Sequence, residues 1–592
     1  MILQALKQYY DRKAEEGSEV PLNGFEWKDL PFLIVIDRRG NFINLEDTRE
    51  THGKSLKAKR FLLPRSVARS GKRSYEKTNF LWDHIGYVLG EPRDNSQKDK
   101  ELAAKQHESW LAGLRQLKGK VGDGAYIEAI LKFYERNGVS SVKSTSEFVE
   151  CQKIPGCNIT FRLKSETVPI PSSTTAREYI MRQMSMDGNG SNEDVVTCLV
   201  TGEEGPIARI HGSTPITKDS RVLISFQKGQ GYDSYGKQQG ANAPIIRSTE
   251  FAYTTALNML LKSGNQRMLV GDSHTVFWAS KESNLEHNLA SFFQEPERLD
   301  PDSGASVVRE LFDSVKSGAY IKESEDPNFY VLGLSPNAAR IAVRFWEPGK
   351  VSVFSQRIKQ YFDDFAIIGG PKDPEYYSLQ SILKYISPRD DKDRLPPSVA
   401  GDLMRSILGG TAYPSMLLQL ALNRIRADTD YRVKRVRAAT IKAYLNRYYE
   451  FNPDRRFEEI KMALDKDQQS TGYHVGRLFA TLERIQEKAS PNLNATIRQR
   501  YYGAACTSPE SVFPTLLRLK NHHLAKIDSK GMVIWFEKTI GEILSNIGSF
   551  PNHMDLHEQG MFAIGYYHQR QNFYSGNAAA PEHEMKEETR SD

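Results

Sequence analysis

A glycine-rich stretch near the middle of the chain, GQGYDSYGKQQGANAP at residues 229–244, nearly matches the phosphate-binding signature G-x-x-x-x-G-K-[ST]. Such a loop needs a strand before it, a helix that begins at the Gly-Lys pair, and a hydroxyl on the next residue to hold magnesium. The apolar run at 221–227 supplies a plausible strand, but Gln238 stands where the hydroxyl is required. The capping-type sequence at 248–250 predicts that the next helix begins seven or more residues after Lys237. We therefore keep a P-loop-like, nucleotide-dependent enzyme using Lys237 as the alternative, and expect a protein without catalytic activity.

The same loop has the chemistry of a nucleic-acid contact. Glycines let a backbone approach a ligand closely, amide side chains form hydrogen bonds with base edges, and tyrosines stack on bases. The candidate residues are Tyr232, Tyr235, Lys237, Gln238, Gln239 and Asn242. The alternative is a structural loop that closes a hydrophobic core.

Other catalytic and metal-binding patterns are missing from the sequence, which contains no H-E-x-x-H, C-x-x-C or G-x-S-x-G motif. Cys151 and Cys157 are the only near pair among the four cysteines, and they lack the two-residue gap of a zinc knuckle. We expect them to be reduced, half-buried thiols. His522 and His523 have no second cluster at ligand spacing. No cofactor and no metal are therefore predicted.

Positive charge is concentrated in two blocks, although the formal net charge is only +6. Runs of one sign repel themselves, which makes them poor stabilisers of a fold and good ligands for polyanions. The first block holds a single acidic residue, Glu76, and consists of Lys54, Lys57, Lys59, Arg60, Arg65, Arg69, Lys72, Arg73 and Lys77. The second block is interrupted by Asp428 and Asp430 and consists of Arg424, Arg426, Arg432, Lys434, Arg435, Arg437, Lys442 and Arg447. Either block alone fits a solvated face, but two of them favour a nucleic-acid partner.

The periodicity of apolar residues predicts an α+β chain of several domains. Residues 1–370 alternate short apolar runs with helical pieces, which predicts a mixed α/β region with antiparallel sheets for DNA recognition. An all-α C-terminal helical bundle follows, with a basic helical linker at 371–461 and a further helical bundle at 462–576, which the resemblance described below implies is small-subunit-like. Residues 577–592 lack an apolar stripe and are predicted to be disordered.

Two local patterns are more specific. The apolar runs within residues 31–47 flank a turn that contains Gly40, which predicts a β-hairpin. The first residues have apolar side chains at helical spacing and lack the basic start of a secretory signal, and no apolar run is long enough to span a membrane. These patterns predict a cytoplasmic protein that begins with an amphipathic helix.

Nine segments, in order along almost the entire chain, resemble the large subunit of the type I-C CRISPR interference complex, the Cascade surveillance particle. The segments are MILQALKQYYDR (1–12), TNFLWDHIGYVLG (78–90), SYGKQQGANAP (234–244), FAYTTALN (251–258), GDSHTVFWA (271–279), FYVLGLSPNAARIAVRFW (329–346), GYHVGRLFATLERIQ (472–486), TIRQRYYGAA (496–505) and EQGMFAIGYYHQRQ (558–571). None of them is a catalytic motif, but their joint order is specific.

The resemblance implies a non-enzymatic role in the cytoplasm of a prokaryote. Such a subunit belongs to a guide-RNA ribonucleoprotein, recognises the protospacer-adjacent motif in double-stranded target DNA, and helps to part the strands and stabilise the R-loop. It then presents the displaced single strand to a helicase-nuclease. The implied protein partners are the backbone and guide-processing subunits and a small subunit made by internal translation. Met462 is the predicted start, because it leaves 131 residues, enough for a small helical bundle.

In that role the first basic block meets DNA. We predict that Lys72, Arg73 and Lys77 hold the DNA backbone and that Asn79 reaches a groove edge, with Lys237, Gln238 and Asn242 as further contacts to the motif. The alternative for Asn79 is to cap the helix that follows it. The remaining backbone contacts predicted for this block are Lys54, Lys57, Lys59, Arg60, Arg65 and Arg69.

The second basic block is predicted to follow the displaced strand. Its contacts are Arg432, Lys434, Arg435 and Arg437, helped by Tyr444, Tyr448 and Tyr449 unless these tyrosines pack the bundle. Weaker candidates for strand or subunit contacts are Arg477, Arg484, Arg498, Gln569 and Arg570.

Overall fold

The computed structural model describes residues 2–16, 20–52, 55–67, 69, 73–94, 96–122, 124–190, 195–216, 221–229, 231, 233, 235–295, 303–317, 326–337, 340–371, 373–428, 433–453, 458–491 and 496–574. The predicted disordered tail at 577–592 lies outside these residues. The chain forms two compact units, Met1–Met259 and Leu260–Asp592, called unit 1 and unit 2 below.

A four-stranded sheet with the order β3-β2-β8-β7 is the centre of the first part of unit 1. Its strand β2 (Phe32–Ile36) is a continuous apolar run and is buried throughout, as expected for a strand covered on both faces. Strand β2 pairs antiparallel with β3 (Phe42–Asp47) and parallel with β8 (Asn158–Leu163), and β8 pairs antiparallel with β7 (Trp82–His84). The hairpin predicted within 31–47 is confirmed, and the β2–β8 pair adds a parallel element that the sequence did not indicate.

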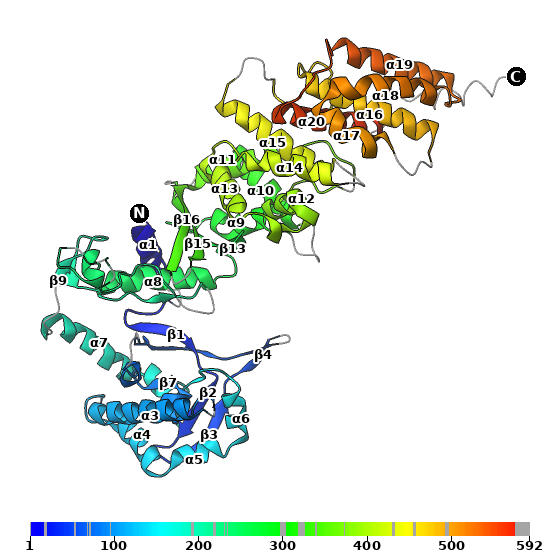
Figure 1. Cartoon of the computed structure of the whole chain (residues 1–592). Coiled ribbons are helices and arrows are strands. Elements are labelled where there is room, and N and C mark those ends of the chain that lie inside the picture. Colours follow the sequence, from blue (N-terminus) through cyan, green and yellow to red (C-terminus); the bar gives the residue numbers. More distant parts are fainter. Residues whose placement is uncertain are drawn as a thin grey trace. The chain divides into compact units, whose positions relative to one another are not determined.

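Helices pack against this sheet (Figure 1). Phe161 from β8 packs with Trp110, Ile130 and Phe133 from the helices in one hydrophobic core. The helices and 3-10 turns of this part are η1 (Ser74–Glu76), α2 (Ile85–Val88), α3 (Gln97–Leu117), α4 (Ala125–Glu135), α5 (Gly138–Lys143), α6 (Ser146–Gln152), η2 (Ile170–Ser172) and α7 (Thr174–Gly190).

The remainder of unit 1 consists of two longer helices and four two-stranded antiparallel pairs. The helices are α1 (Ile2–Glu15), which confirms the predicted amphipathic start, and α8 (Arg247–Lys262), which runs on past the end of the unit. The pairs are β1 (Phe25–Asp29) with β6 (Arg60–Pro64), β4 (Glu50–His52) with β5 (Ser55–Lys57), β9 (Val195–Thr197) with β10 (Glu204–Pro206), and β11 (Ser213–Thr214) with β12 (Arg221–Val222).

Unit 2 begins with a meander of four antiparallel strands. They lie in sequential order and are β13 (Arg267–Val270), β14 (Ser273–Ala279), β15 (Asn328–Asn337) and β16 (Arg340–Lys350). Three helices follow strands of this sheet, namely α9 (Asn284–Phe293), α10 (Ser303–Ser317) and α11 (Val351–Asp364). Phe277, Phe329 and Phe345 of the sheet share one hydrophobic core with the helices.

The rest of unit 2 is helical, as the sequence pattern predicts. Its helices are α12 (Leu379–Ile386), η5 (Pro388–Asp390), η6 (Lys392–Arg394), α13 (Pro397–Gly409), α14 (Met416–Ala427), α15 (Arg435–Phe451), α16 (Thr471–Ala489), α17 (Ile497–Thr507), α18 (Pro509–Leu524), α19 (Lys530–Ser545) and α20 (Leu556–Tyr574). Together with the sheets before it, this region confirms the predicted α+β class.

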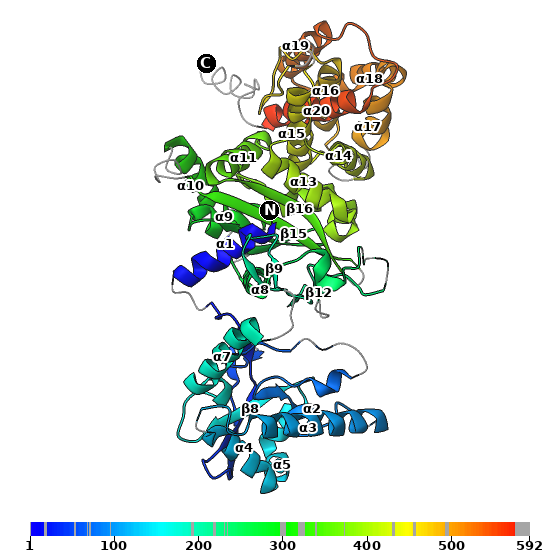
Figure 2. The same ribbon diagram turned by 90° about the vertical axis from the view of Figure 1, so that its left-hand side faces the viewer.

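Helices α16 and α20 lie side by side in the C-terminal bundle (Figures 1 and 2), and small residues let their backbones meet. A Cβ added to Gly476 would lie 2.1 Å from the carbonyl oxygen of Phe562, and one added to Gly565 would lie 2.0 Å from that of Tyr473. Neither position accepts a side chain without separating the helices. Two of the nine segments that carry the resemblance are therefore the two sides of one helix contact.

The boundary between the two compact units does not lie near residue 370, where the sequence pattern changes from mixed to helical. One hydrophobic core of unit 2 extends from Met268 on β13 to Tyr567 on α20, because the helices after residue 370 pack on those before it. The structure therefore places the boundary between compact units at 259/260. Among the described residues, no helix has the length and apolar character needed to cross a membrane.

Candidate nucleic-acid interface

The first basic block begins on the β4–β5 hairpin, an arm that extends from unit 1 in Figure 1. Lys57, Lys59 and Arg60 are exposed at its base, while Lys54 lies outside the described residues. Arg60 comes within 3.8 Å of Asp29, and both side chains are largely open to solvent, so this ion pair is weak. The arm thus presents at least three accessible cations, as the sequence predicts for a surface that meets phosphate.

Arg65, the next cation of the block, has a structural role. Its guanidinium forms a bidentate pair with Glu250 on α8, with Nη1 2.9 Å from Oε2 and Nη2 3.2 Å from Oε1. Glu250 also accepts from the backbone N–H of Gly212 at 2.6 Å and from the Thr254 hydroxyl at 2.9 Å. Burial alone raises the pKa of Glu250, but the hydrogen bonds and charge of Arg65 outweigh burial, and the pKa is lowered. This pair ties the end of β6 to α8 and to the segment around Gly212.

Arg69 and Asn79 surround a buried carboxylate that the sequence analysis missed. Asp83 accepts hydrogen bonds from the Arg69 guanidinium, from the backbone N–H of Asn79 at 3.0 Å and from the backbone N–H of His84 at 2.9 Å. The sequence held one signal for this site, since Asp83 is an acidic residue within an apolar segment that follows a basic block. A buried carboxylate needs a cationic or hydrogen-bonding partner, and the block supplies one. Arg69 also covers the ring of Tyr87, 4.2 Å from its centroid, so its cation is committed within the fold.

Both readings of Asn79 need correction. The side chain is only 6 % exposed, and its Oδ1 accepts from the backbone N–H of Val67 at 2.9 Å. An amide held in this way does not present its hydrogen-bonding edge to a groove. Nor does it cap the helix, since α2 is capped by His84, whose Nδ1 accepts from Gly86 N–H. Asn79 instead fixes the loop that carries the basic block.

The last cations of the first block lie next to the short turn η1. Arg73 is exposed and pairs with Glu76 over 2.6 Å, and Lys77 is exposed at the end of the turn. Lys72 lies outside the described residues. The contacts predicted for Arg73 and Lys77 are therefore compatible with their positions, and all three stay predictions.

The glycine-rich loop does not have the geometry of a phosphate-binding loop. The strand before it, β12, ends at Val222, and Lys237 is followed by η3 (Gln239–Asn242), a single 3-10 turn. Helix α8 begins at Arg247, ten residues after Lys237, which confirms the predicted late start. No α-helix N-terminus therefore stands at the Gly-Lys pair to receive a phosphate.

The loop presents an unusually exposed set of side chains. Tyr235 is 99 % exposed and has a φ of 50°, a value rare for a residue with a Cβ, and Lys237 and Gln238 are exposed beside it. Asn242 is turned inward and donates from Nδ2 to the Gln239 carbonyl at 3.1 Å. Lys237 and Gln238 are therefore accessible, while Asn242 holds the turn. Tyr232 lies outside the described residues.

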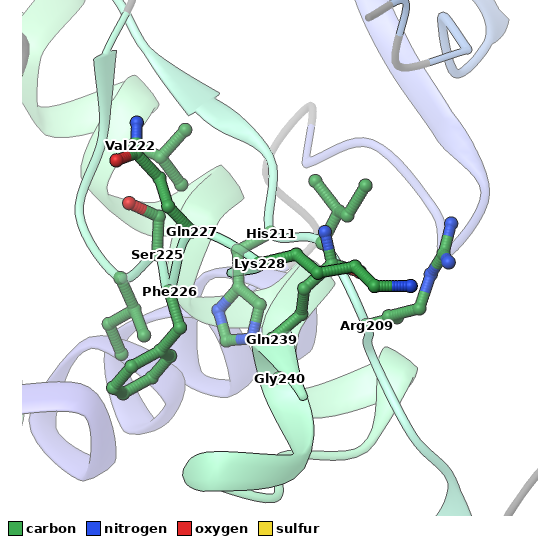
Figure 3. A pocket seen from close by; sticks show the side chains of 11 residues that line it. Arg209, His211, Val222, Ser225, Phe226, Gln227, Lys228, Gln239 and Gly240 are labelled. Atoms are coloured by element: carbon green, nitrogen blue, oxygen red, sulfur yellow. The ribbon is translucent and has the colours of Figure 1, made fainter. Parts of the chain in front are cut away.

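Beside this loop a cavity of about 630 Å³ opens in unit 1 (Figure 3). Three segments hold it together: the Gly240 N–H donates to the Arg209 carbonyl at 3.1 Å, the Ala208 N–H donates to the Ile245 carbonyl at 2.8 Å, and β11 pairs with β12. Its lining is Arg209, Ile210, His211, Val222, Ile224, Ser225, Phe226, Gln227, Lys228, Gln239 and Gly240. Of these lining residues, only Gln239 is among the nucleic-acid contacts predicted from the sequence.

The second basic block is mostly used inside unit 2. Arg437 is 0 % exposed and donates to Asp428 at 2.7 Å, to Asp390 at 3.3 Å and to the Tyr385 carbonyl at 3.1 Å. The prediction that Arg437 contacts the displaced strand is corrected, because its guanidinium is sealed among carboxylates and a carbonyl. Lys442 and Arg447 are buried as well.

The other predicted strand contacts of this block are partly exposed. Lys434 lies 3.2 Å from Asp390, and Arg435 donates to the Ile367 carbonyl at 2.8 Å while its guanidinium lies 5.3 Å from the Tyr377 ring centroid. Arg432 lies outside the described residues. The proposed contacts of Lys434 and Arg435 with the displaced DNA strand stay predictions. Asp390 and the Ile367 carbonyl already bind these two cations and would compete with DNA for them.

The tyrosines of α15 pack the bundle. Tyr444 is buried and stacks with Tyr448 at 5.9 Å between ring centroids, and the Tyr449 hydroxyl lies 3.0 Å from Nδ1 of His557 on α20. The packing alternative is therefore the one that the structure supports for these rings.

The arginines of the C-terminal helices are likewise held by carboxylates. Arg477 is buried and donates to Gln569 at 3.1 Å and to Glu542 at 2.9 Å. The buried Glu483 attracts Arg570 at 2.6 Å and Arg498 at 3.6 Å. Arg484 pairs with Glu487 at 3.2 Å. These side chains hold α16, α17, α19 and α20 together, which is a structural use of residues first considered as contacts.

The four cysteines are buried and free, and the Sγ atoms of Cys151 and Cys157 lie 3.2 Å apart. They are more deeply buried than predicted. Within the described ranges, no cluster of three or more histidine, cysteine, aspartate or glutamate side chains is placed to hold a metal ion.

Met462, the predicted internal start, precedes α16 and is 54 % exposed, so it is not a core side chain. Its carbonyl accepts from the Ile368 N–H at 2.8 Å. Its use as a start codon stays a prediction.

Comparison with known proteins agrees with the resemblance of the nine segments. A search of curated proteins found no significant match. A family model described as CRISPR-associated protein (Cas_Csd1) matches residues 6–574, nearly the whole chain. The chain, with its basic arm, its exposed glycine-rich loop and its C-terminal helical bundle, therefore belongs to the Cas_Csd1 family of CRISPR-associated proteins.

Proposed function

We propose that this protein is the non-catalytic large subunit of a type I-C CRISPR surveillance complex and recognises the protospacer-adjacent motif in duplex DNA. The family match over residues 6–574 is the observation that carries the proposal. In this role the protein assists strand separation, stabilises the R-loop and presents the displaced strand to a helicase-nuclease. It works with guide RNA, the backbone and guide-processing subunits, and a small subunit started at Met462, in the prokaryotic cytoplasm.

The distribution of accessible charge supports duplex binding by unit 1. Lys57, Lys59 and Arg60 are exposed on the arm, and Lys237 and Gln238 are exposed on the glycine-rich loop. In guide-directed complexes the guide RNA reads the target by base pairing, so the protein needs only to hold phosphates and read a few base pairs. Cations grip phosphate without sequence preference, whereas amides such as Gln238 discriminate base edges.

A selection experiment tests motif recognition. The complex reconstituted with guide RNA is incubated with duplexes that carry a fixed target beside a randomised flank, and the bound fraction is sequenced. We expect enrichment of one short motif on one side of the target. The Gln238→Ala variant should reduce the enrichment of that motif. Lys237→Ala should instead weaken the binding of duplexes with every flanking sequence to the same extent.

The matched control is Lys118→Ala, because Lys118 is exposed at the end of α3 and outside both surfaces. It should bind and select like the wild-type complex. Tight duplex binding by the wild-type complex without any flank preference would contradict motif recognition.

A further inference from the structure

We propose that the cavity beside the glycine-rich loop binds one unpaired nucleotide of a single-stranded nucleic acid. The proposal extends the proposed function, because it gives the protein a site for a nucleotide that has left a duplex or stands at the end of a guide. The cavity volume of about 630 Å³ lies within the range of small-molecule sites. It is separate from the accessible Lys237 and Gln238, which do not line it.

The charge of the cavity favours an anion. Arg209 and Lys228 are both exposed, and their side chains extend toward the same side in Figure 3. Neither forms an ion pair with another described residue, and the lining contains no carboxylate. Burial lowers the pKa of the third basic side chain, His211, which is therefore neutral near pH 7. Two cations that no described carboxylate pairs with, at the rim of a cavity, suit a phosphate group.

An aromatic wall gives the cavity a second feature of a nucleotide site. Phe226 lines the cavity and is half-buried, and its ring makes no contact with another ring or with a cation among the described residues. Phe161, by contrast, packs against the rings of Phe133 and Tyr134 in unit 1. In Figure 3 this ring lies on the opposite side of the lining side chains from the ends of Arg209 and Lys228, and a ring face that no described ring or cation covers is a surface on which an unpaired base stacks.

Two amide side chains also line the cavity. Gln227 is exposed on the segment that carries Phe226 and Lys228, and Gln239 faces the cavity from η3. Both amides donate and accept hydrogen bonds, which matches the edges of a base that has no pairing partner. Ring, amides and cations thus supply a stacking face, hydrogen-bonding groups and positive charge along one cavity.

One wall of the cavity is built on a close approach of two backbone segments. A Cβ added to Gly240 would lie 2.3 Å from the Ala208 carbonyl oxygen and 3.0 Å from Arg209 Cα, so only glycine allows this approach. On the other side His211 is buried, and its Nδ1 contacts the Tyr253 hydroxyl on α8. Gly240 thus holds η3, and with it Gln239, against the segment that carries Arg209.

The experiment measures binding of the full chain to three fluorescein-labelled probes: an oligo(dT) strand, an oligo(rU) strand and a blunt duplex of mixed sequence. Phe226→Leu removes the ring but keeps an apolar side chain, whereas Phe226→Trp keeps a stacking face. We expect Phe226→Leu to weaken single-strand binding about tenfold, Phe226→Trp to retain it, and duplex affinity to change less than about twofold in both. Lys228→Ala should weaken single-strand binding about fivefold.

The matched controls are Phe451→Leu, on an exposed phenylalanine at the end of α15, and Lys118→Ala. Both should bind all three probes like the wild type. A larger loss with oligo(rU) would identify the RNA strand as the source of the nucleotide, and a larger loss with oligo(dT) would identify DNA. Ultraviolet cross-linking of either strand should label peptides within 209–211 or 221–228.

Unchanged single-strand affinity in both Phe226→Leu and Lys228→Ala, or cross-links found only elsewhere, would overturn the cavity proposal while duplex binding persists. A wild-type complex that fails to bind duplex DNA would instead count against the proposed function. The two failures are therefore distinguishable.

Discussion

The two basic blocks look alike in the sequence and differ in how many of their cations the structure leaves exposed. In the first block Lys57, Lys59 and Arg60 remain exposed on an arm of unit 1. In the second block Arg437 and Arg447 are buried within unit 2. A cation sealed against carboxylates is a structural counter-ion, while an exposed cation is available to a polyanion. Charge density along a chain therefore shows where cations are, and burial decides whether a ligand can reach them.

The largest expected effect lies in the buried block. Arg437→Ala removes a buried guanidinium that pairs with Asp428 at 2.7 Å and with Asp390 at 3.3 Å. We expect a loss of about 3–5 kcal/mol in the free energy of unfolding, because the substitution breaks two ion pairs of a buried cation at once. Chemical denaturation followed by circular dichroism measures it. The exposed counterpart, Lys57→Ala, should change stability by less than about 0.5 kcal/mol. Equal effects of the two substitutions would break the comparison.

The next effect concerns duplex affinity. Reversing charge at Lys57, Lys59 and Arg60 together should weaken duplex binding about 30-fold at low salt and make the dependence of log K on log salt shallower by about 2 to 3. Fluorescence anisotropy over a series of sodium chloride concentrations gives both quantities. Thermal unfolding of the same variant should stay close to the wild type, because these side chains make few contacts. An unchanged salt slope would remove the arm from the DNA-binding surface.

A smaller effect tests the ion pair that anchors the first block. A glutamate in the unfolded chain titrates at its ordinary pKa, whereas the pKa of Glu250 in the folded chain is lowered by Arg65. The stability that it contributes is therefore complete above the unfolded pKa and is lost as pH falls through the folded pKa. Glu250→Gln should cost about 1–3 kcal/mol at pH 7 and less in acid, so its unfolding curve should vary less with pH.

The control for that measurement is Glu76→Gln, since the Glu76 carboxylate pairs with an exposed Arg73. Because a solvent-exposed pair contributes little to stability, this variant should follow the pH dependence of the wild type. If Glu250→Gln and Glu76→Gln gave the same curves, Arg65 would belong with the accessible cations rather than with the anchors.

The smallest expected effect is at Lys237. Because Lys237 stands before a 3-10 turn and is followed by Gln238, we expect no ATP hydrolysis by the purified protein with or without DNA. Lys237→Ala should leave that background unchanged in a phosphate-release assay. Turnover by the wild type that disappears in Lys237→Ala would establish the nucleotide-dependent alternative.

Within the fold, prediction succeeded where the pattern was local. The hairpin β2–β3 follows from two apolar runs around a glycine turn, and α16 follows from apolar residues at helical spacing. The run at 221–227 was less well predicted, because β12 stops at Val222 and the following residues line a cavity. A run of seven residues is too short for its apolar periodicity to show whether it forms a strand or lines a cavity.

Within the candidate interface, several residues could not be predicted correctly because their roles depend on contacts with residues far away in the sequence. Asn79 and Arg437 have the side chains of nucleic-acid ligands, yet one is held by the backbone of Val67 and the other by Asp428 and Asp390. The cavity was not predicted, because Arg209, Phe226 and Gln239 come from three segments that meet only in the folded chain.

Residue spacing was enough to establish the α+β class, the helical C-terminal region and the poor match to a phosphate-binding loop, and nine ordered segments pointed to a CRISPR-associated protein. These properties depend on neighbouring residues and on their spacing, which a linear chain displays directly. Only the tertiary structure decided which cations are free, which carboxylates hold the rest, and where a ring, two amides and two cations surround one cavity. Burial and pairing depend on residues far apart in the chain, and their positions are set by packing rather than by local pattern.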